Sequence, residues 1–132
     1  MKEAAPQVAF APGSHMISAY GNGAFAFAGM RHAGSILATP QGVRAIEAQS
    51  VDDLEAGTLA PLIAECAERP GSIEFLIVGT GARMTPIGAS LKAALEGAGL
   101  RCEAMATGPA LRVYNVMQSE GRRVAAALLA AP

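Results

Sequence analysis

The chain has 132 residues, the length of one ordinary domain and too short for two independent hydrophobic cores. Apolar residues make up 52% of it and charged residues 16%, a composition typical of a folded protein and not of a disordered one. Ten Lys and Arg residues face eleven Asp and Glu residues, for a formal net charge of -1. This balance argues against nucleic acids and anionic membrane surfaces as partners, because both bind concentrated positive charge.

Cysteine spacing and hydropathy indicate a cytoplasmic protein without a metal or cofactor. Cys66 and Cys102 are far apart and form no Cys-x-x-Cys pair, so we expect two buried, reduced thiols. The longest apolar runs, Phe75 to Val78 and Val124 to Ala131, fall short of the roughly 20 residues of a membrane helix. The N-terminal segment lacks the apolar stretch of a signal peptide, and no membrane insertion is expected.

The N-terminal third has the alternation and turn residues of an antiparallel meander. We expect residues 1–13 to be irregular, because they show no periodicity. The turns are Gly21-Asn22-Gly23, whose residues tolerate positive φ, and Pro40-Gln41-Gly42. The strands predicted around these turns are Ile17–Tyr20, Ala24–Ala28, Ser35–Thr39 and Val43–Glu47.

The middle of the chain changes to a strand–helix–strand pattern. A first helix carries the apolar stripe Leu59, Leu62, Ile63 and Cys66 and stops at Pro70-Gly71. The continuous apolar strand Ile73–Val78 follows, and Thr85 and Pro86 predict the cap and first residue of a second helix. Leu100–Ala106 is the next strand. Residues 73–106 therefore predict two neighbouring parallel strands joined by a helix.

The last segment reads as helical, and the whole chain as one α/β domain. Thr107-Gly108-Pro109 predicts a helix start, and Leu111, Tyr114 and Met117 give that helix an apolar stripe. Val124, Leu128 and Ala131 predict a second stripe after Gly121, with Ser119 as its cap. We expect two C-terminal helices or one bent helix.

One candidate site is the loop between the buried strand and the second central helix. It contains Gly79, Thr80, Gly81 and Arg83, at the strand end where α/β proteins bind ligands and near a helix N-terminus that attracts anions. The dinucleotide fingerprint requires a small residue where this chain has Met84, and the Gly-Lys-Ser/Thr ending of a phosphate loop is absent. The glycines have a second interpretation, a tight strand-to-helix turn.

A second candidate site is the polar face of the first C-terminal helix. Arg112, Asn115 and Ser119 recur at i, i+3 and i+7, beside the apolar stripe that contains Tyr114. This pattern is typical of a solvated face, of a recognition surface, or of a hydrogen-bond network at a helix junction. The charged residues that follow and belong to the same candidate site are Glu120, Arg122 and Arg123.

No catalytic constellation is predicted. His15 and His32, the only histidines, lie near strand ends without an accompanying Ser or Cys motif. Asp52 and Asp53 lie together in a loop, where carboxylates more commonly start a helix than bind a metal. The sequence therefore predicts a protein that is not an enzyme.

Four motifs in the last hundred-odd residues resemble an uncharacterised family of small α/β proteins. That family includes the mitochondrial NADH dehydrogenase (complex I) assembly factor three. The resemblance implies a three-layer fold with a mixed central sheet, no known catalytic residues, and, from the mitochondrial relatives, a role in assembling a membrane respiratory complex. The motifs are Tyr20-Gly21-x-Gly23-x-Phe25 with Gly29 and Gly34, Val78-Gly79-Thr80-Gly81-x-Arg83, Thr107-x-x-Ala110-x-x-x-Tyr114-Asn115, and Glu120-Gly121-Arg122.

Three functional hypotheses follow from the residues and the resemblance. The first is a non-enzymatic binding or assembly protein whose partners are subunits of a respiratory complex. The second is a small-molecule or anion binder, with or without catalysis, that uses the loop from Gly79 to Arg83. The third is a structural subunit of an oligomer. In the first, Arg112 and Arg123 are the expected exposed contacts, whereas Asn115 and Glu120 are expected to be structural.

Overall fold

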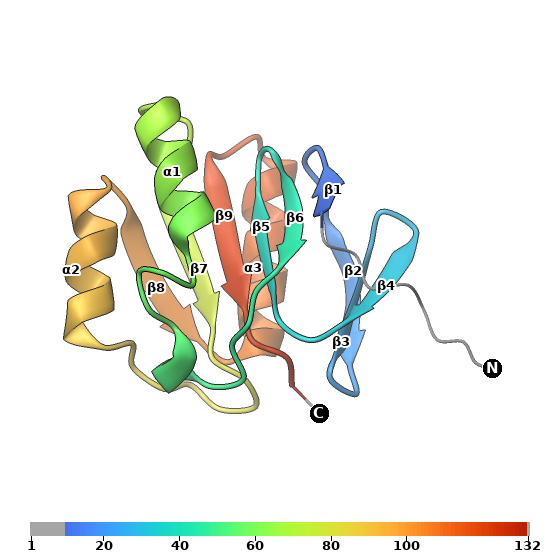
Figure 1. Ribbon diagram of the computed structural model, residues 1–132. Coiled ribbons are helices and arrows are strands. Elements are labelled where there is room, and N and C mark those ends of the chain that lie inside the picture. The colour runs from blue at the N-terminus through green and yellow to red at the C-terminus, as the bar shows by residue number, and fades with distance from the viewer. Residues whose placement is uncertain (1–9, 132) are drawn as a thin grey trace.

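The computed structural model describes residues 10–131 and has three layers (Figure 1). A mixed six-stranded sheet forms the middle layer. Helices α1 (Ala60–Glu68) and α2 (Ala89–Gly97) cover one face of it. Helix α3 (Thr107–Ser119) and a separate three-stranded antiparallel sheet cover the other face. The expected three-layer α/β fold is confirmed.

The remaining elements are nine strands and one short 3-10 helix in the described residues. They are β1 (Phe10–Pro12), β2 (Ile17–Gly21), β3 (Ala24–Phe27), β4 (Met30–Ala33), β5 (Ile36–Thr39), β6 (Gly42–Ala45), η1 (Val51–Asp53), β7 (Phe75–Gly79), β8 (Arg101–Met105) and β9 (Val124–Leu128).

The predicted pair of parallel strands is confirmed. The central sheet has the order β1-β6-β5-β9-β7-β8, and β7 pairs in parallel with both β8 and β9. The helix between β7 and β8 begins at Ala89 and not at Pro86. Residues 80–88 instead form a loop, because the hydroxyl of Thr80 accepts the backbone N–H of Thr85 at 3.0 Å and holds it in a turn.

The prediction of a second C-terminal helix is wrong, because residues 124–128 form the strand β9. All five residues of β9 are buried, and β9 lies between β5 and β7 in the sheet. Alanine favours helices in isolation, but a strand covered on both faces needs only apolar side chains, and sheet pairing overrides the propensity. Ser119 caps no second helix either, since its hydroxyl donates to the carbonyl of Val116 at 2.8 Å.

The expected four-stranded meander is divided between two sheets. β2, β3 and β4 form the three-stranded sheet, whereas β5 and β6 join the central sheet. The prediction missed β4, which follows a tight turn at Ala28 and Gly29 with φ of 51° and 74°. Phe10–Pro12 forms β1 beside β6, so the expectation of irregular structure is wrong for these residues. Residues 1–9 lie outside the described residues.

The two faces of the central sheet bury two separate groups of apolar side chains. Leu62 of α1 and Leu95 of α2 are fully buried with Leu76 on one face. Tyr114 of α3 is buried with Phe25 of the small sheet on the other face. Within residues 10–131 no helix is both long and apolar enough to span a bilayer.

The last residue of β7 must be glycine because α3 begins directly against it. A Cβ added to Gly79 would lie 2.9 Å from Cδ2 of Leu128, 2.9 Å from Oγ1 of Thr107 and 3.0 Å from the Cα of Thr107. The two Thr107 atoms, the buried hydroxyl oxygen and the backbone Cα, cannot move aside without breaking hydrogen bonds. This contact fixes how closely α3 approaches the sheet.

We predict that Gly79→Ala lowers the free energy of unfolding by about 1–3 kcal/mol, the usual cost of overpacking. Gly97→Ala is the matched control, because an added Cβ there has no atom within 4 Å. It should raise the stability by up to about 1 kcal/mol, since alanine is the better helix residue. Urea unfolding measures both variants, and equal stability of the two would contradict this packing.

Candidate functional site

The structure separates the two predicted sites by the full length of the central strands. The loop from Gly79 to Arg83 follows β7 at the carboxyl edge of the parallel strands. The residues from Glu120 to Arg123 precede β9, which runs parallel to β7, so they lie at the opposite edge. Arg112, Tyr114 and Asn115 lie between these ends on α3. The predicted residues therefore do not form one site.

The glycine loop is held by hydrogen bonds within the chain. The N–H of Thr80 donates to the carbonyl of Met105 at 2.8 Å, and the N–H of Gly81 donates to Oγ1 of Thr107 at 2.9 Å. In the reverse direction, the N–H of Thr107 donates to the carbonyl of Gly81 at 2.8 Å. The hydroxyl of Thr80 donates to the carbonyl of Arg83 at 2.5 Å. An anion would have to compete with these bonds for the same N–H groups.

These bonds join the two segments that border the crevice in which open α/β sheets usually hold a ligand. After β7 the chain leads to α2 on one face, and after β8 it leads to α3 on the other. Such a divergence between neighbouring parallel strands normally opens a crevice at their carboxyl ends. Here the reciprocal bonds between Gly81 and Thr107 join the two outgoing segments. The interpretation of the glycines as a tight turn agrees with this geometry.

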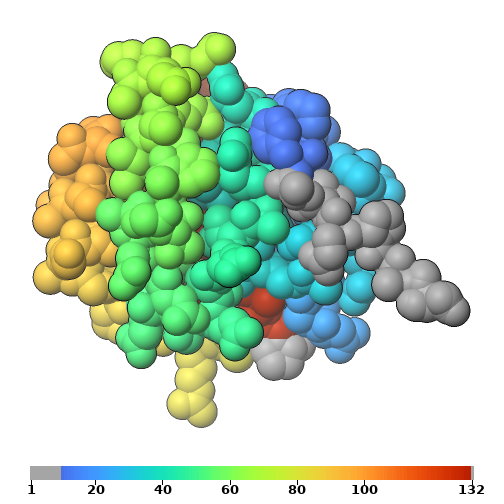
Figure 2. All heavy atoms as spheres, viewed as in Figure 1, coloured from blue at the N-terminus to red at the C-terminus, as the bar shows by residue number. Residues whose placement is uncertain are grey.

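The surface around the loop carries carboxylates. A hollow of about 330 Å³ is lined by Thr80 and Gly81 on one side and by Asp52 on the other. A neighbouring hollow of about 530 Å³ includes Asp52 and Glu55 opposite Ser90 at the start of α2. Arg83 is exposed, and its segment projects at the lower edge of the molecule (yellow in Figure 2). The local charge therefore opposes anion binding.

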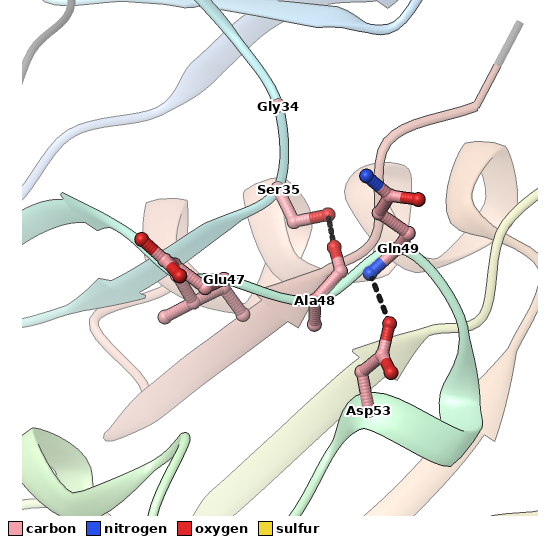
Figure 3. A pocket seen from close by; sticks show the side chains of 7 residues that line it. Gly34, Ser35, Glu47, Ala48, Gln49 and Asp53 are labelled. Carbon is pink, nitrogen blue, oxygen red and sulfur yellow. Dashed lines mark hydrogen bonds between the residues drawn. The ribbon is translucent and has the colours of Figure 1, made fainter.

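A third hollow, of about 430 Å³, lies between the start of β5 and the segment before η1 (Figure 3). Two of its polar side chains, those of Ser35 and Asp53, are already engaged in structural bonds. Ser35 donates its hydroxyl to the carbonyl of Ala48 at 2.6 Å, and Asp53 accepts the N–H of Gln49 at 2.9 Å. Asp53 thus caps η1, which is the helix-start role expected for it.

The polar face of α3 docks the small sheet onto the helix. Oδ1 of Asn115 accepts the N–H of Ile17 at 2.9 Å, and its Nδ2 donates to the carbonyl of Ile17 at 2.8 Å. The amide thus takes the place of a neighbouring strand at the edge of β2. Tyr114, buried to 1% exposure, donates its hydroxyl to the carbonyl of His15 at 3.1 Å. Burial raises the pKa of Tyr114 to about 12, so the hydroxyl remains a donor.

The charged residues after α3 lie at the surface and make contacts of unequal strength. Arg123 is exposed, as expected, and it donates to the carbonyl of Gly71 at 2.8 Å and pairs with Glu74. Arg122 stacks with its guanidinium 5.2 Å from the ring centre of Phe75. Glu120 lies 3.6 Å from Arg122 in a solvated pair. Such exposed pairs contribute little to stability.

Sequence reasoning missed a surface that we call the α3–β2 seam, where residues 14–21 run along α3. Gln118 donates to the hydroxyl of Ser14 at 2.6 Å at one end of it. At the other end the hydroxyl of Tyr20 lies against Gly108, where an added Cβ would displace the tyrosine side chain. Large apolar side chains remain exposed along the seam, namely Met16 at 53%, Tyr20 at 42% and Val116 at 56%.

A signal for this surface was present in the sequence. Val116 lies one turn after Arg112, within the polar face of the predicted helix, where an apolar residue is out of pattern. Arg112 is exposed, as expected. The strand that lies against this helix could not be recognised from sequence, because about a hundred residues separate Ile17 from Asn115.

The surroundings of the cysteine and histidine side chains are those of structural residues and not of reactive groups. Burial raises the pKa of Cys66 and raises that of Cys102 to about 11, whereas a reactive thiol requires a lowered pKa. Burial also lowers the pKa of His32 in β4. His15 contacts the carbonyl of Pro12 through Nε2 at 2.8 Å. Within residues 10–131 no three His, Cys, Asp or Glu side chains gather as a metal site would require.

The chain is a small three-layer α/β protein whose α3–β2 seam carries exposed apolar side chains. The chain belongs to the family described as protein of unknown function (DUF498/DUF598), whose model matches residues 17–129. It is 38% identical over 120 residues to an uncharacterised protein of Rhodobacter capsulatus, covering 91% of this chain and 88% of that one.

Two solved structures of relatives have the same fold. A crystal structure described as an outer membrane protein from Bartonella henselae matches with a TM-score of 0.84 and 35% identity, covering 92% of this chain and 98% of that one. A solution structure of a Bordetella pertussis protein, described as an Mth938-like domain, matches with a TM-score of 0.74 and 32% identity. The match covers 98% of this chain and 92% of the Bordetella pertussis chain. The family resemblance is thus confirmed.

We predict that inorganic phosphate at millimolar concentration leaves the melting temperature unchanged at constant ionic strength. The N–H groups of Thr80 and Gly81 are already donated, and Asp52 repels an anion from the adjoining hollow. Sodium chloride of equal ionic strength is the control in differential scanning fluorimetry. A rise specific to phosphate would indicate binding by mass action and would restore the anion hypothesis.

We predict that Asn115→Ala lowers the free energy of unfolding by about 1–3 kcal/mol, because both backbone groups of Ile17 lose their partner. Glu120→Ala, at the end of the same helix, should change it by less than about 0.5 kcal/mol, because its ion pair is solvated. Chemical unfolding of both variants tests the contrast. A neutral Asn115→Ala would refute the docking role of this amide.

Proposed function

We propose that this chain is a non-enzymatic protein-binding protein that acts through the α3–β2 seam. The observation that carries the proposal is the exposure of Met16, Tyr20 and Val116, each more than two-fifths accessible, along one junction of the fold. Isolated apolar residues are common on protein surfaces, whereas a group of them on one rigid feature is typical of an interaction site.

The composition of the seam supports binding of a protein. Tyrosine, methionine and arginine are enriched in the energetically important parts of protein interfaces. Tyr20, Met16 and the exposed Arg112 supply these three types, and Val116 lies one helical turn from Arg112. A partner would therefore gain apolar contact area together with at least one charge that can bind a carboxylate.

The seam is also held in place before any partner arrives. Its two sides are joined by the hydrogen bonds of Asn115, Tyr114 and Gln118 and by the contact of Tyr20 with Gly108. A preorganised surface loses less conformational entropy on association than a flexible one. Binding a partner at this junction therefore costs little conformational entropy.

The partner class is proposed from the resemblance to complex I assembly factors. By that resemblance the partners are subunits of a membrane respiratory complex, and the chain acts from the cytoplasm. The Bartonella henselae neighbour is described as an outer membrane protein, so a membrane-associated partner is also compatible with that description. The family itself has no function in its description.

An affinity pull-down from the native organism, with identification by mass spectrometry, tests the proposal. We expect the wild-type chain to retain respiratory-complex subunits reproducibly. Met16→Asp and Val116→Asp should each reduce this capture at least about tenfold, because a carboxylate is desolvated at the centre of the interface. Far-ultraviolet circular dichroism confirms that the variants are folded.

Met84→Asp is the matched control, because Met84 has 57% exposure against 53% for Met16 but lies in the loop after β7. This variant should retain the partners. Equal losses in Met16→Asp and Met84→Asp would contradict a specific role of the seam. If both variants captured as much partner as the wild type, the binding surface would lie elsewhere.

A further inference from the structure

The strand β8 leaves one side of the central sheet unpaired within residues 10–131. It is the last strand in the order β1-β6-β5-β9-β7-β8 and pairs only with β7 among the described elements. Figure 1 shows it at the left margin of the sheet, on the opposite side of the molecule from β2. Exposed strand edges offer backbone hydrogen bonds to another chain unless they are covered or interrupted.

The backbone groups available at this edge can be identified from the pairing with β7. Arg101 donates its N–H to the carbonyl of Glu74 at 3.0 Å, and Met105 accepts the N–H of Thr80 at 2.8 Å. Alternate residues of a strand direct their backbone groups to opposite sides. The N–H and carbonyl groups of Cys102 and Ala104 therefore point away from β7, toward solvent.

The charges on β8 are arranged so that the strand is complementary to itself. Arg101 and Glu103 are exposed and, being two residues apart, lie on the same face of the strand. In an antiparallel pair of two β8 strands centred on Cys102, each Arg101 lies opposite Glu103 of the second copy. In the register centred on Glu103, two carboxylates would lie directly opposite each other, which is destabilising.

We propose that this chain forms a homodimer by antiparallel pairing of β8 with β8 of a second copy, in the register centred on Cys102. The pairing joins two six-stranded sheets into one continuous sheet, as in other cases of strand addition at an edge. A two-fold axis through the Cys102 pair relates the copies, so the contact closes on itself and leads to no longer polymer. The α3–β2 seam remains accessible in both copies.

The adjoining helix has the same self-complementary charge pattern. Lys92 and Glu96 of α2 are exposed and lie one turn apart on the helix, which packs on the sheet face that carries Cys102. The two-fold axis brings the α2 helices of the two copies to the same face in opposite directions. Lys92 of one copy then approaches Glu96 of the other, which supports the same register.

Charge exchange on β8 tests the register. By sedimentation equilibrium we expect the wild-type chain to dimerise at micromolar concentration. Arg101→Glu should weaken the dimer at least about tenfold, because it places a second carboxylate opposite Glu103 of the other copy. The double variant Arg101→Glu/Glu103→Arg should restore dimerisation, because it reverses the pair and keeps the complementarity. Both positions are exposed, so the fold is expected to survive.

Cross-linking gives an independent measurement of the same register. In this register the two Cys102 Cα atoms are about 5.5 Å apart, within the range that a disulfide spans. Diamide, the oxidant, should therefore link the dimer at alkaline pH, because the thiol of Cys102 has a pKa of about 11 and is partly ionised there. Cys66→Ser should keep the cross-link, and Cys102→Ser should lose it.

Two results would overturn the proposal. One is a wild-type chain that remains monomeric up to millimolar concentration. The other is a dimer whose dissociation constant is the same in the wild type, in Arg101→Glu and in the double variant. The double variant also tests whether Arg101→Glu weakens the dimer only by removing the stacking of Arg101 on Phe75, at 5.9 Å. Both variants lose this stacking, so restored dimerisation in the double variant excludes that explanation.

Discussion

The hydroxyl group of Thr107 holds three segments of the fold together. It accepts the N–H of Gly81 from the loop after β7 and donates to the carbonyl of Leu129 after β9, while Thr107 itself begins α3. Because this group is fully buried, neither bond can be replaced by water without opening the core. The start of α3 is thereby fixed against Gly79, and the segments that follow β7 and β8 are joined at the carboxyl edge of the sheet.

The fold could be predicted from sequence where local patterns carried the information. The apolar run of β7, followed by a glycine turn and an amphipathic helix, was sufficient for the parallel pair with β8. The alanine-rich strand β9 was not recognised, because a short apolar run has the same composition in a buried strand and a buried helix. Its position between β5 and β7 depends on pairing with residues about fifty and ninety positions earlier in the chain.

The candidate site could be predicted only in part, for the same physical reason. Asn115 was recognised as a polar residue on a helix face, but its partner Ile17 was not, since about a hundred residues separate the two in the chain. The glycines of the loop after β7 suggested a phosphate site, whereas the bonds to Thr107 that occupy them are formed only in three dimensions. Arg123 is exposed, as expected, but its pairing with Glu74 and Gly71 could not be predicted, because about fifty residues separate it from both partners.

We propose that the chain binds a protein partner through the α3–β2 seam and not through the carboxyl edge of its strands. Hydrogen–deuterium exchange of the chain, with and without the partner obtained by pull-down, tests this most directly, because it maps protection along the whole backbone. We predict added protection in residues 14–21 and 108–120, with little change in residues 49–57 and 79–88. Protection confined to 49–57 and 79–88 would contradict it.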